Sequence, residues 1–369
     1  MSGKTKPTWI GIALIFLMAV TFAGCIGQEE EVQTTTIVTT EKGKETTKTI
    51  VTTVEPEKPK ELSVMTSITE TQAAEIMAEA EKDLGITINL VRLSEGEGIA
   101  RIRSEAEAGK ITIDCIFLYD FESFLIFKDE GYMIPYIPEG ADQLLHPIVP
   151  GGYGIPVITS PQPILVNTER LAELGYDPPT KWADLADPKW KDEIVHASPV
   201  HSGTAYTTLE VFITLYGEEE GFALWADIDK NIHHYEESGT IGVTLVGTGE
   251  FAVTIPYAYT SVAAIVEGYP IKAIYPEDGT AGKVECVGIL KDIDPAKLDL
   301  AKEFIDWCVS SHAMELYASV AYLHPLKPGT TVPEAMIALD TVPLVDLDRE
   351  YFAAEKDRLV EKWDEQFTR

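Results

Sequence analysis

The residues best suited to chemistry in this chain are two hydroxyls around a glycine, Ser202-Gly203-Thr204. They stand directly before an apolar run, from Ala205 to Tyr216, that has the spacing of an amphipathic helix. The start of a helix exposes unpaired N–H groups and the positive end of the helix dipole, so it binds anions without a basic side chain. The competing interpretation is an ordinary N-cap, in which a hydroxyl accepts a hydrogen bond from its own helix.

Two further features of the same half of the chain could line a binding site. Ser238-Gly239 precede a second apolar run, and so form a second helix start of the same type. Tyr257 and Tyr259 stand at the carboxyl end of a short strand-like segment. The tyrosines are either a half-buried aromatic pair that closes the strand, or phenol groups that serve as hydrogen-bond donors or as Fe(III) ligands.

The preceding half of the chain predicts the elements that would complete such a site. Strand-like runs at 62–66, 86–93 and 111–118 alternate with helical patterns at 73–84 and 99–108, and residues 94–98 form a turn. This βαβαβ order predicts parallel strands with helices covering the sheet. Ligands of open parallel sheets bind beyond the carboxyl ends of the strands.

The carboxyl ends of these strands include several acidic residues. We place the strand ends at Ser67, at Glu95 to Gly98, and at Asp120. The first two lead into helix starts and favour anions, yet Glu95, Glu97 and Asp120 are acidic. Either these carboxylates point to solvent, or the ligand also carries positive charge.

The N-terminus predicts export and anchoring rather than part of the fold. Residues 1–24 have the charged start and the short apolar stretch of a signal peptide, and the residues before Cys25 resemble a lipoprotein lipobox. We therefore expect Cys25 to carry a lipid anchor. Residues 25–61 are rich in Thr, Lys and Glu with little to bury, so we predict a disordered linker, whose glycosylation the sequence leaves open.

Charge and cysteine content limit the partners and the covalent structure. The net charge of −31 excludes nucleic acid as a partner, because phosphate binding needs basic patches. Cys115, Cys286 and Cys308 lie in apolar runs, where buried free thiols are the default. A disulfide between Cys115 and Cys286 stays open, since an exported protein meets an oxidising environment.

Catalytic motifs are scarce. The sequence has no nucleophile elbow, no zinc-protease motif, no paired Cys-x-x-Cys and no phosphate loop. His233-His234 with Glu236 and Glu237 could bind a metal, although adjacent histidines serve more often as surface polar groups. We expect no cofactor, and a hydrolase that uses paired carboxylates stays open because such pairs leave no sequence signature.

Four segments together resemble a known family. They are 182–191, 202–206, 215–222 and 275–280, with sequences WADLADPKWK, SGTAY, LYGEEEGF and YPEDGT. In this order and spacing, they are similar to the extracellular solute-binding proteins of ABC importers, in the ferric-iron-binding-like and phosphonate-binding-like group of the type II periplasmic binding fold. The resemblance extends from about residue 62 to about residue 328.

The resemblance implies a two-lobed α/β fold with mostly parallel sheets, helices on both faces and a ligand cleft between the lobes. Lobe 1 would comprise 62–158 and 284–369, and lobe 2 would comprise 159–283. Carried over to this sequence, the ligand-binding residues would be Ser67, Gly96, Glu97, Gly98, Ser202, Gly203, Thr204, Ala205, Ser238, Gly239, Tyr257 and Tyr259. Iron binders of the group often have adjacent tyrosines, whereas Ala258 separates them here.

The expected function is capture rather than catalysis. A monomer tethered by its lipid to the extracellular face of the cytoplasmic membrane would deliver a small ligand to ABC permease subunits. The Ser-Gly-Thr helix start favours an oxyanion-bearing solute, such as a phosphonate or a phosphate ester. The alternatives are a ferric-iron-binding protein, with Tyr257 and Tyr259 as metal ligands, and a secreted hydrolase.

Overall fold

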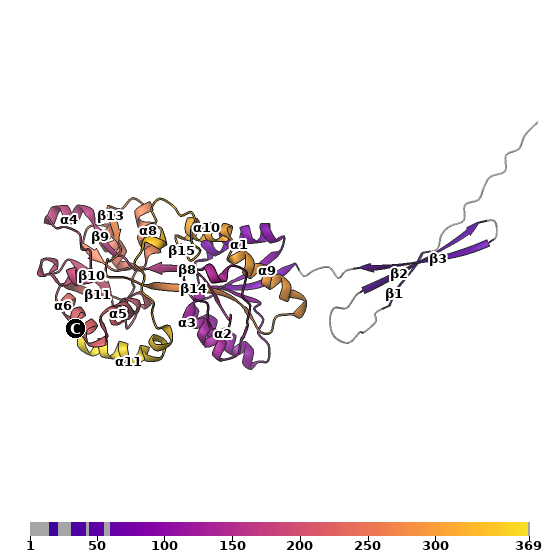
Figure 1. The fold of residues 1–369 in the computed structure, drawn as a ribbon, viewed down its shortest axis with the longest axis horizontal. Helices are drawn as coiled ribbons and strands as arrows, with labels where there is room; N and C mark the ends of the chain where they lie inside the picture. The colour runs from indigo at the N-terminus through magenta and orange to yellow at the C-terminus, as the bar shows by residue number, and fades with distance from the viewer. Residues whose placement is uncertain (1–14, 21–30, 42–43, 55–59, 368–369) are drawn as a thin grey trace, which may run out of the picture. The chain divides into compact units, whose positions relative to one another are not determined.

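The computed structural model describes residues 15–20, 31–41, 44–54 and 60–367. The chain divides into two compact units, Met1–Pro59 and Lys60–Arg369 (Figure 1). The predicted lipid-anchor residue, Cys25, and most of the predicted signal peptide lie outside the described residues. Within the described ranges, no helix combines the length and the apolar character needed to cross a membrane.

The N-terminal unit contains a small antiparallel sheet in the order β1-β2-β3. Its strands are β1 (Ile15–Val20), β2 (Glu31–Glu41) and β3 (Lys44–Val54). We predicted no regular structure for 25–61, and the strands differ from that prediction. β2 and β3 are rich in Thr, Val and Ile, and these β-branched residues favour extended backbone even where little can be buried.

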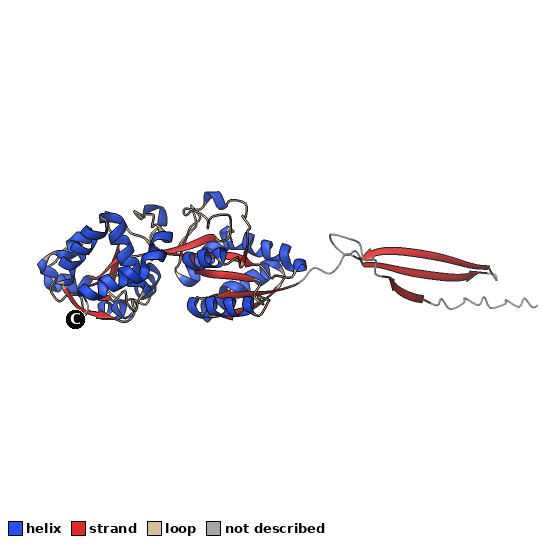
Figure 2. Cartoon of the chain, turned by 90° about the horizontal axis from the view of Figure 1, so that it is seen from below, coloured by secondary structure: helices blue, strands red, loops and turns tan. Residues whose placement is uncertain are grey.

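The second unit contains two sheets with helices against them (Figures 1 and 2). The first lobe has the seven-stranded sheet, in the order β15-β8-β14-β6-β4-β5 with β7 beside β14. Its strands are β4 (Glu61–Thr66), β5 (Thr87–Arg92), β6 (Cys115–Asp120), β7 (Met133–Ile134), β8 (Ile155–Pro161), β14 (Gly282–Leu290) and β15 (His324–Pro325). The helices of this lobe are α1 (Glu70–Leu84), α2 (Glu95–Glu107), α3 (Phe121–Asp129), α9 (Leu298–Cys308) and α10 (Ser311–Ala321).

The second lobe has a five-stranded sheet in the order β11-β10-β12-β9-β13. Its strands are β9 (Ile164–Asn167), β10 (Ile194–Ala197), β11 (Ile232–Glu236), β12 (Val253–Thr254) and β13 (Ile271–Ile274). Its helices are α4 (Thr168–Leu174), α5 (Gly203–Tyr216), α6 (Glu218–Asp229), α7 (Ile241–Gly247), α8 (Ala258–Val266) and α11 (Arg349–Phe367). Short 3-10 helices complete the chain: η1 (Ala141–Gln143), η2 (Trp182–Ala186), η3 (Pro188–Trp190), η4 (Pro295–Lys297) and η5 (Leu339–Thr341).

Strands β8 and β14 run side by side between the two lobes (Figure 1). At one level of β14, opposite Cys286, both neighbouring strands contain an extra residue, Leu118 in β6 and Val157 in β8. Leu118 has a left-handed backbone with φ of 53°. Such bulges reverse the side-chain alternation of a strand. Leu118 therefore packs with Phe117 in one core cluster, and Tyr119 turns to the other face of the sheet.

The predicted α/β class and two-lobed architecture are confirmed, but the sheets are mixed rather than mostly parallel. Strands β4, β5 and β6 are parallel, as predicted, and so are β10, β11 and β12. The connections between the lobes run antiparallel: β14 pairs antiparallel with β6, β7 and β8, and β9 with β12 and β13. Strands that return from the other lobe enter each sheet in the reverse direction, which the βαβ pattern does not encode.

The C-terminal helix belongs to a different lobe from the one that we predicted. The proposed first lobe included residues 284–369, but α11 packs in the core of the second lobe through Phe352, Leu359, Trp363 and Phe367. The buried Tyr206 hydroxyl of α5 donates a 2.7 Å hydrogen bond to the carbonyl oxygen of Phe352. The apolar face of α11 thus determines its lobe.

The register of β6 and β14 answers the question of a disulfide between Cys115 and Cys286. All three described cysteines are free and buried. On the paired strands β6 and β14, Cys115 lies opposite Ile289, whereas Cys286 lies opposite Tyr119. The two thiols also belong to core clusters on opposite faces of the sheet. Geometry therefore prevents a bridge between Cys115 and Cys286.

Candidate functional site

The start of α5 is not capped by its own hydroxyl. Ser202 is the N-cap residue, yet no described side chain makes a cap hydrogen bond there. The first intrahelical bond runs from the N–H of Tyr206 to the carbonyl oxygen of Ser202, at 3.0 Å. The ordinary N-cap interpretation is therefore not what the structure shows. The first turn of α5 also contains no acidic residue, so its dipole is not neutralised by the helix itself.

Other segments of the second lobe converge on this helix start. Gly239, before α7, lies so close that a Cβ atom built on it would be 2.6 Å from the Thr204 hydroxyl oxygen. The Tyr257 hydroxyl, at the start of α8, is 3.0 Å from the Thr207 hydroxyl and 3.4 Å from the carbonyl oxygen of Gly203. The structure thus brings together three of the predicted segments: 202–205, 238–239 and the tyrosine segment.

A buried glutamine between the lobes supports the first turn of α5. Gln162 lies between β8 and β9 and is fully buried. Its amide nitrogen donates to the carbonyl oxygen of Thr204 at 2.7 Å, and its amide oxygen accepts from the Thr208 hydroxyl at 3.1 Å. The connection between the lobes therefore fixes the position of Thr204, a role that no sequence pattern indicated.

The two tyrosines stack on one another. The ring centroids of Tyr257 and Tyr259 are 6.2 Å apart, and the ring planes differ by 23°. Burial raises the pKa of both phenols above the ordinary value. The pair therefore combines the two interpretations from the sequence: it closes the strand, and the hydroxyl of Tyr257 reaches polar groups of α5.

On the first lobe, the predicted glycine-rich turn is the first turn of a helix. α2 begins at Glu95 rather than at residue 99, and Ser94 and Glu97 form a reciprocal capping box. The Glu97 carboxylate accepts a 2.9 Å hydrogen bond from the Ser94 N–H. Gly98 is buried, and a Cβ atom built on it would lie 2.3 Å from the Tyr119 hydroxyl oxygen. Glu97 and Gly98 thus have structural partners that account for them.

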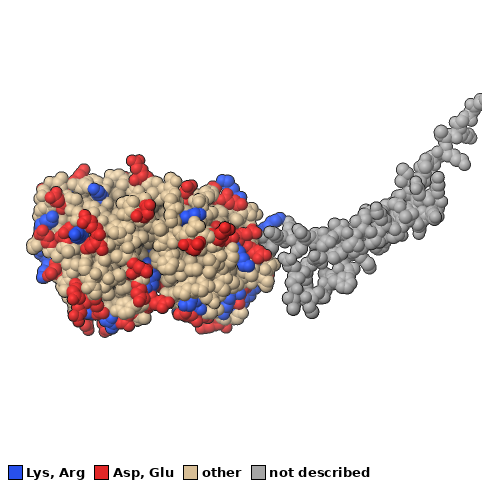
Figure 3. All heavy atoms as spheres, in the orientation of Figure 1, with Lys and Arg blue, Asp and Glu red and all other residues tan. Residues whose placement is uncertain are grey.

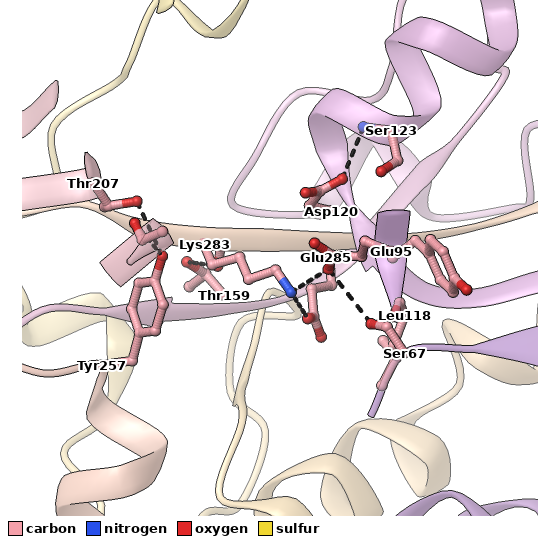
Figure 4. A network of polar contacts seen from close by, with 12 residues as sticks. Ser67, Glu95, Leu118, Asp120, Ser123, Thr159, Thr207, Tyr257, Lys283 and Glu285 are labelled. Carbon is pink, nitrogen blue, oxygen red and sulfur yellow. Dashed lines mark hydrogen bonds and ion pairs between the residues drawn. The ribbon is translucent and has the colours of Figure 1, made fainter. Parts of the chain in front are cut away.

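Glu95 points the other way, into a cluster of charged groups (Figure 4). Lys283 of β14 donates a hydrogen bond to the carboxyl group of Glu95 and forms an ion pair with Glu285 at 2.6 Å. Ser67, at the end of β4, places its hydroxyl 2.9 Å from the carbonyl oxygen of Leu118 and 3.4 Å from Glu95 Oε1. Asp120 ends β6, and one of its carboxylate oxygens accepts from the N–H of Ser123 at 2.8 Å. We call Glu95, Asp120, Lys283 and Glu285 the carboxylate cluster.

The bulge at Leu118 creates this cluster. It reverses the alternation of β6, so that Asp120 stands directly opposite Glu285 on the paired strand. Like charges in that position destabilise a sheet. Lys283, two residues before Glu285 on the same strand, lies on the same face and supplies the compensating charge.

The titration of the cluster reflects burial and crowding. Burial first, and then the nearby carboxyl groups of Asp120 and Glu285, raise the pKa of Glu95 to about 8 against the opposing effect of Lys283. Burial alone would lower the pKa of Lys283, but Glu285, Glu95 and Asp120 raise it well above its usual range. Lys283 is therefore charged, and Glu95 keeps its proton near neutral pH.

Some of the important residues were not predicted from the sequence. Gln162, Lys283 and Glu285 lie on the connecting strands, where a polar residue in an apolar run was the only available signal. The acidic strand ends at Glu95 and Asp120 were noticed but left with two interpretations. Ser67, Ser202, Gly203, Thr204, Ala205, Ser238, Gly239, Tyr257 and Tyr259 remain predicted ligand contacts, as does the exposed Gly96.

The histidines form no metal site in the part of the chain that the structure describes. His233 and His234 contact one another at 2.8 Å, and His234 contacts Glu236 at 2.7 Å. No group of three or more His, Cys, Asp or Glu side chains in residues 60–367 has an arrangement that could hold a metal ion. The face shown in Figure 3 carries acidic side chains with basic ones interspersed, and no broad basic patch.

Comparisons with known proteins agree with this architecture. The profile of the bacterial extracellular solute-binding protein family matches residues 113–354. An uncharacterised protein of Haemophilus influenzae is 29% identical over 288 residues, which cover 75% of this chain and 82% of that protein.

Solved structures of periplasmic binding proteins are similar as well. The periplasmic binding protein AfuA from Actinobacillus pleuropneumoniae, solved with fructose-6-phosphate bound, is 26% identical, with a TM-score of 0.68 over 83% of this chain and 98% of that one. Iron-bound HitA from Pseudomonas aeruginosa is 17% identical, with a TM-score of 0.69 over 83% of this chain and 99% of that one, and so shows the fold alone. The chain belongs to the bacterial extracellular solute-binding protein family, and it is a solute-binding protein of an ABC importer rather than an enzyme.

Proposed function

We propose that this protein captures an oxyanion-bearing solute, a phosphate ester or a phosphonate, and delivers it to ABC permease subunits. The observation that carries the proposal is the start of α5, whose first N–H groups have no cap from a described side chain. Gly203 is exposed there, and the hydroxyls of Ser202 and Thr204 lie beside it. Backbone N–H groups and hydroxyls at a helix start suit phosphoryl oxygens.

The surroundings of the helix start support this assignment. Gly239 permits a close approach of the second Ser-Gly segment, and the Tyr257 hydroxyl adds a further polar group within 3.4 Å of the Gly203 carbonyl oxygen. AfuA, the similar protein at 26% identity, was solved with a sugar phosphate. A buried phosphoryl group held by several such donors would be shielded from water, which strengthens each hydrogen bond.

The test is a thermal-shift titration of the full-length protein in mild detergent. The probes are inorganic phosphate, fructose 6-phosphate, glucose 6-phosphate, ethylphosphonate, sulfate and ferric citrate. A ligand present at one hundred times its dissociation constant adds about 2.7 kcal/mol to the free energy of unfolding. Stabilisation by a phosphoryl probe that is lost in Ser202→Ala and Thr204→Val supports the proposal. Stabilisation by none of the phosphoryl probes contradicts it.

Ferric iron is the second candidate, and the tyrosine pair is the observation that favours it. Iron would require tyrosinate, whereas burial raises the pKa of Tyr257 and its hydroxyl already contacts Thr207 at 3.0 Å. The neutral phenol suits a hydrogen-bonding role better. An iron-binding protein would instead give a coloured complex with ferric citrate, and Tyr257→Phe and Tyr259→Phe would remove the colour.

We also propose that Cys25 carries the lipid anchor, so that the protein is a monomer on the extracellular face of the membrane. The support is the sequence before Cys25 and the family of exported binding proteins to which the chain belongs. Incorporation of labelled palmitate into the wild-type protein, absent from Cys25→Ser, would support the anchor. Equal release of both proteins into the medium would contradict it.

A further inference from the structure

The carboxylate cluster has more acidic groups than bases. Three carboxyl groups, those of Glu95, Asp120 and Glu285, face one ammonium group, that of Lys283. The acids come from three separate elements: the start of α2, the end of β6 and the connecting strand β14. Even with Glu95 protonated, two further acids face the single base, and this excess requires another explanation.

One carboxyl oxygen of this cluster is buried without a hydrogen-bond partner among the described residues. Glu285 is 5% exposed, and its Oε2 atom is buried with no hydrogen-bond partner among the described residues. A buried carboxylate oxygen without a donor carries a substantial free-energy cost. Asp120 stands directly opposite on the paired strand and adds a second negative charge.

The cluster is not sealed off from ligands. The side chains of Lys283 and Glu95 are each 26% exposed. Tyr259 of the proposed oxyanion site is partly exposed, and its phenol lies within electrostatic range of Lys283, Glu285 and Glu95. Figure 4 shows Lys283 between Tyr257 and Thr207 on one side and Glu95 and Asp120 on the other.

From this arrangement we propose that the solute carries an ammonium group as well as its oxyanion, and that Glu95, Asp120 and Glu285 recognise it. The inference rests on the proposed function, because it places the oxyanion at α5 and the cation at the opposite lobe. The ligand would then be zwitterionic: an aminoalkylphosphonate or an amino-sugar phosphate. The shared chemistry is a primary amine attached to a phosphoryl group.

The protonation of Glu95 supplies a second, independent readout. Its pKa of about 8 leaves the carboxyl largely protonated at pH 7. A ligand ammonium beside it would favour the carboxylate and so displace the proton. The titratable groups that face Glu95 are Lys283, Glu285, Asp120, Tyr119 and Tyr259. Among these groups, Lys283 is the one base, and it faces more than one acid.

The experiment compares matched probes by isothermal titration calorimetry on the full-length protein in detergent. One pair is 2-aminoethylphosphonate with ethylphosphonate, and the other is glucosamine 6-phosphate with glucose 6-phosphate. In at least one pair, we expect the amine to bind tighter by about tenfold or more, since a charge-assisted hydrogen bond to a buried carboxylate has that strength. A preference in the first pair identifies the ligand as an aminoalkylphosphonate, and a preference in the second identifies it as an amino-sugar phosphate.

The variants test whether the cluster causes the preference. Glu285→Gln and Glu95→Gln should reduce the affinity ratio within that pair toward one, whereas Glu107→Gln, at an exposed position of α2, should leave it intact. The ratio is measured on a single preparation, so a partly unfolded variant still reports it. If Glu285→Gln does not fold, the partly exposed Glu95→Gln gives the answer.

The proton readout follows in buffers of different ionisation enthalpy at pH 7. The amine probe should release a proton in the wild-type protein, with an observed enthalpy that changes with the buffer, and Glu95→Gln should abolish that dependence. Amines that bind no tighter than their amine-free partners overturn the inference, and the proposed function then survives if the amine-free probes still require Ser202. If no phosphoryl probe binds, both fail. A preference for the amine that Glu95→Gln and Glu285→Gln leave unchanged also overturns the inference.

Discussion

The two lobes present helix starts of similar sequence that the structure treats in opposite ways. α2 begins after Ser94 with Glu95 and Gly96, and α5 begins after Ser202 with Gly203 and Thr204. The first is closed by its own capping box, in which Ser94 and Glu97 bond one another's backbone. The second has no side-chain cap and no acidic residue in its first turn.

The difference indicates that the two helix starts suit ligand groups of opposite charge. A helix start that satisfies its own N–H groups and carries acids no longer attracts anions, and Glu95 makes the α2 start suitable for a cation. A helix start left uncapped keeps its donors for a ligand. A serine at the N-cap is therefore compatible with both roles, and the residues three positions later, Glu97 and Ala205, distinguish them.

The largest expected effect comes from removing the one positive charge of the carboxylate cluster beside the α2 start. Lys283→Met should lower the free energy of unfolding by about 3 kcal/mol, because it leaves buried carboxylates without a counter-charge. Urea denaturation at pH 7 measures the change. The matched control is Lys272→Met, at an exposed position of β13. Equal losses in the two variants would show that the carboxylate cluster does not depend on Lys283.

Substitution of the two N-cap serines, Ser94 and Ser202, should separate an effect on stability from an effect on ligand binding. Ser94→Ala removes a cap and should cost about 1 kcal/mol in the free energy of unfolding. Ser202→Ala removes no cap and should instead weaken binding of a phosphoryl ligand by about 1–3 kcal/mol. Chemical denaturation and calorimetry on both variants provide the two measurements. A large stability loss in Ser202→Ala with unchanged affinity would reverse the comparison.

Two glycines test the boundary of α2. Gly98→Ala should destabilise the protein by about 1–2 kcal/mol, because the new Cβ atom would collide with Tyr119. Gly96→Ala has nothing within 4 Å and lies in the first turn of the helix, so it should stabilise by about 0.5–1 kcal/mol. Thermal unfolding of both variants decides between a helix and a turn at 95–98. Destabilisation by Gly96→Ala would favour the turn.

The two glutamates of α2 should give opposite pH dependences. The folded state raises the pKa of Glu95 from 4.5 to about 8, so the protonated form contributes stability that is lost as the pH rises across that interval, by at most about 1.4 kcal/mol per pH unit. Hydrogen bonds from Ser94 lower the pKa of Glu97, so its contribution is lost on acidification below about 4.5.

Stability profiles of the two variants measure these contributions. Glu95→Gln should flatten the profile between pH 5 and pH 8, although Glu210, with a pKa raised to about 8 by burial, keeps part of the slope. Glu97→Gln should flatten only the acidic limb. Identical profiles would mean that the two carboxyl groups have similar surroundings.

The sequence was sufficient to predict the fold class and the α5 start, because periodicity and helix-start chemistry are local. It misplaced the start of α2, since two glycines in five residues indicate a turn unless the partner of Gly98, Tyr119, is known. It placed α11 in the wrong lobe, because chain order does not encode which core a terminal helix joins. Lys283 and Glu285 were not predicted, since only the bulged register of β6 and β14 brings Glu285 opposite Asp120, with Lys283 two residues away.

The bulge at Leu118 has a dynamic consequence. An extra residue interrupts the ladder of hydrogen bonds between β6 and β14, so the segment that carries Tyr119 and Asp120 is uncoupled from the regular pairing at Cys115 to Phe117. Local opening follows such interruptions. Amide hydrogens beyond the bulge should therefore exchange with solvent faster than those before it, and the end of the strand at the carboxylate cluster can adjust while its core end stays rigid.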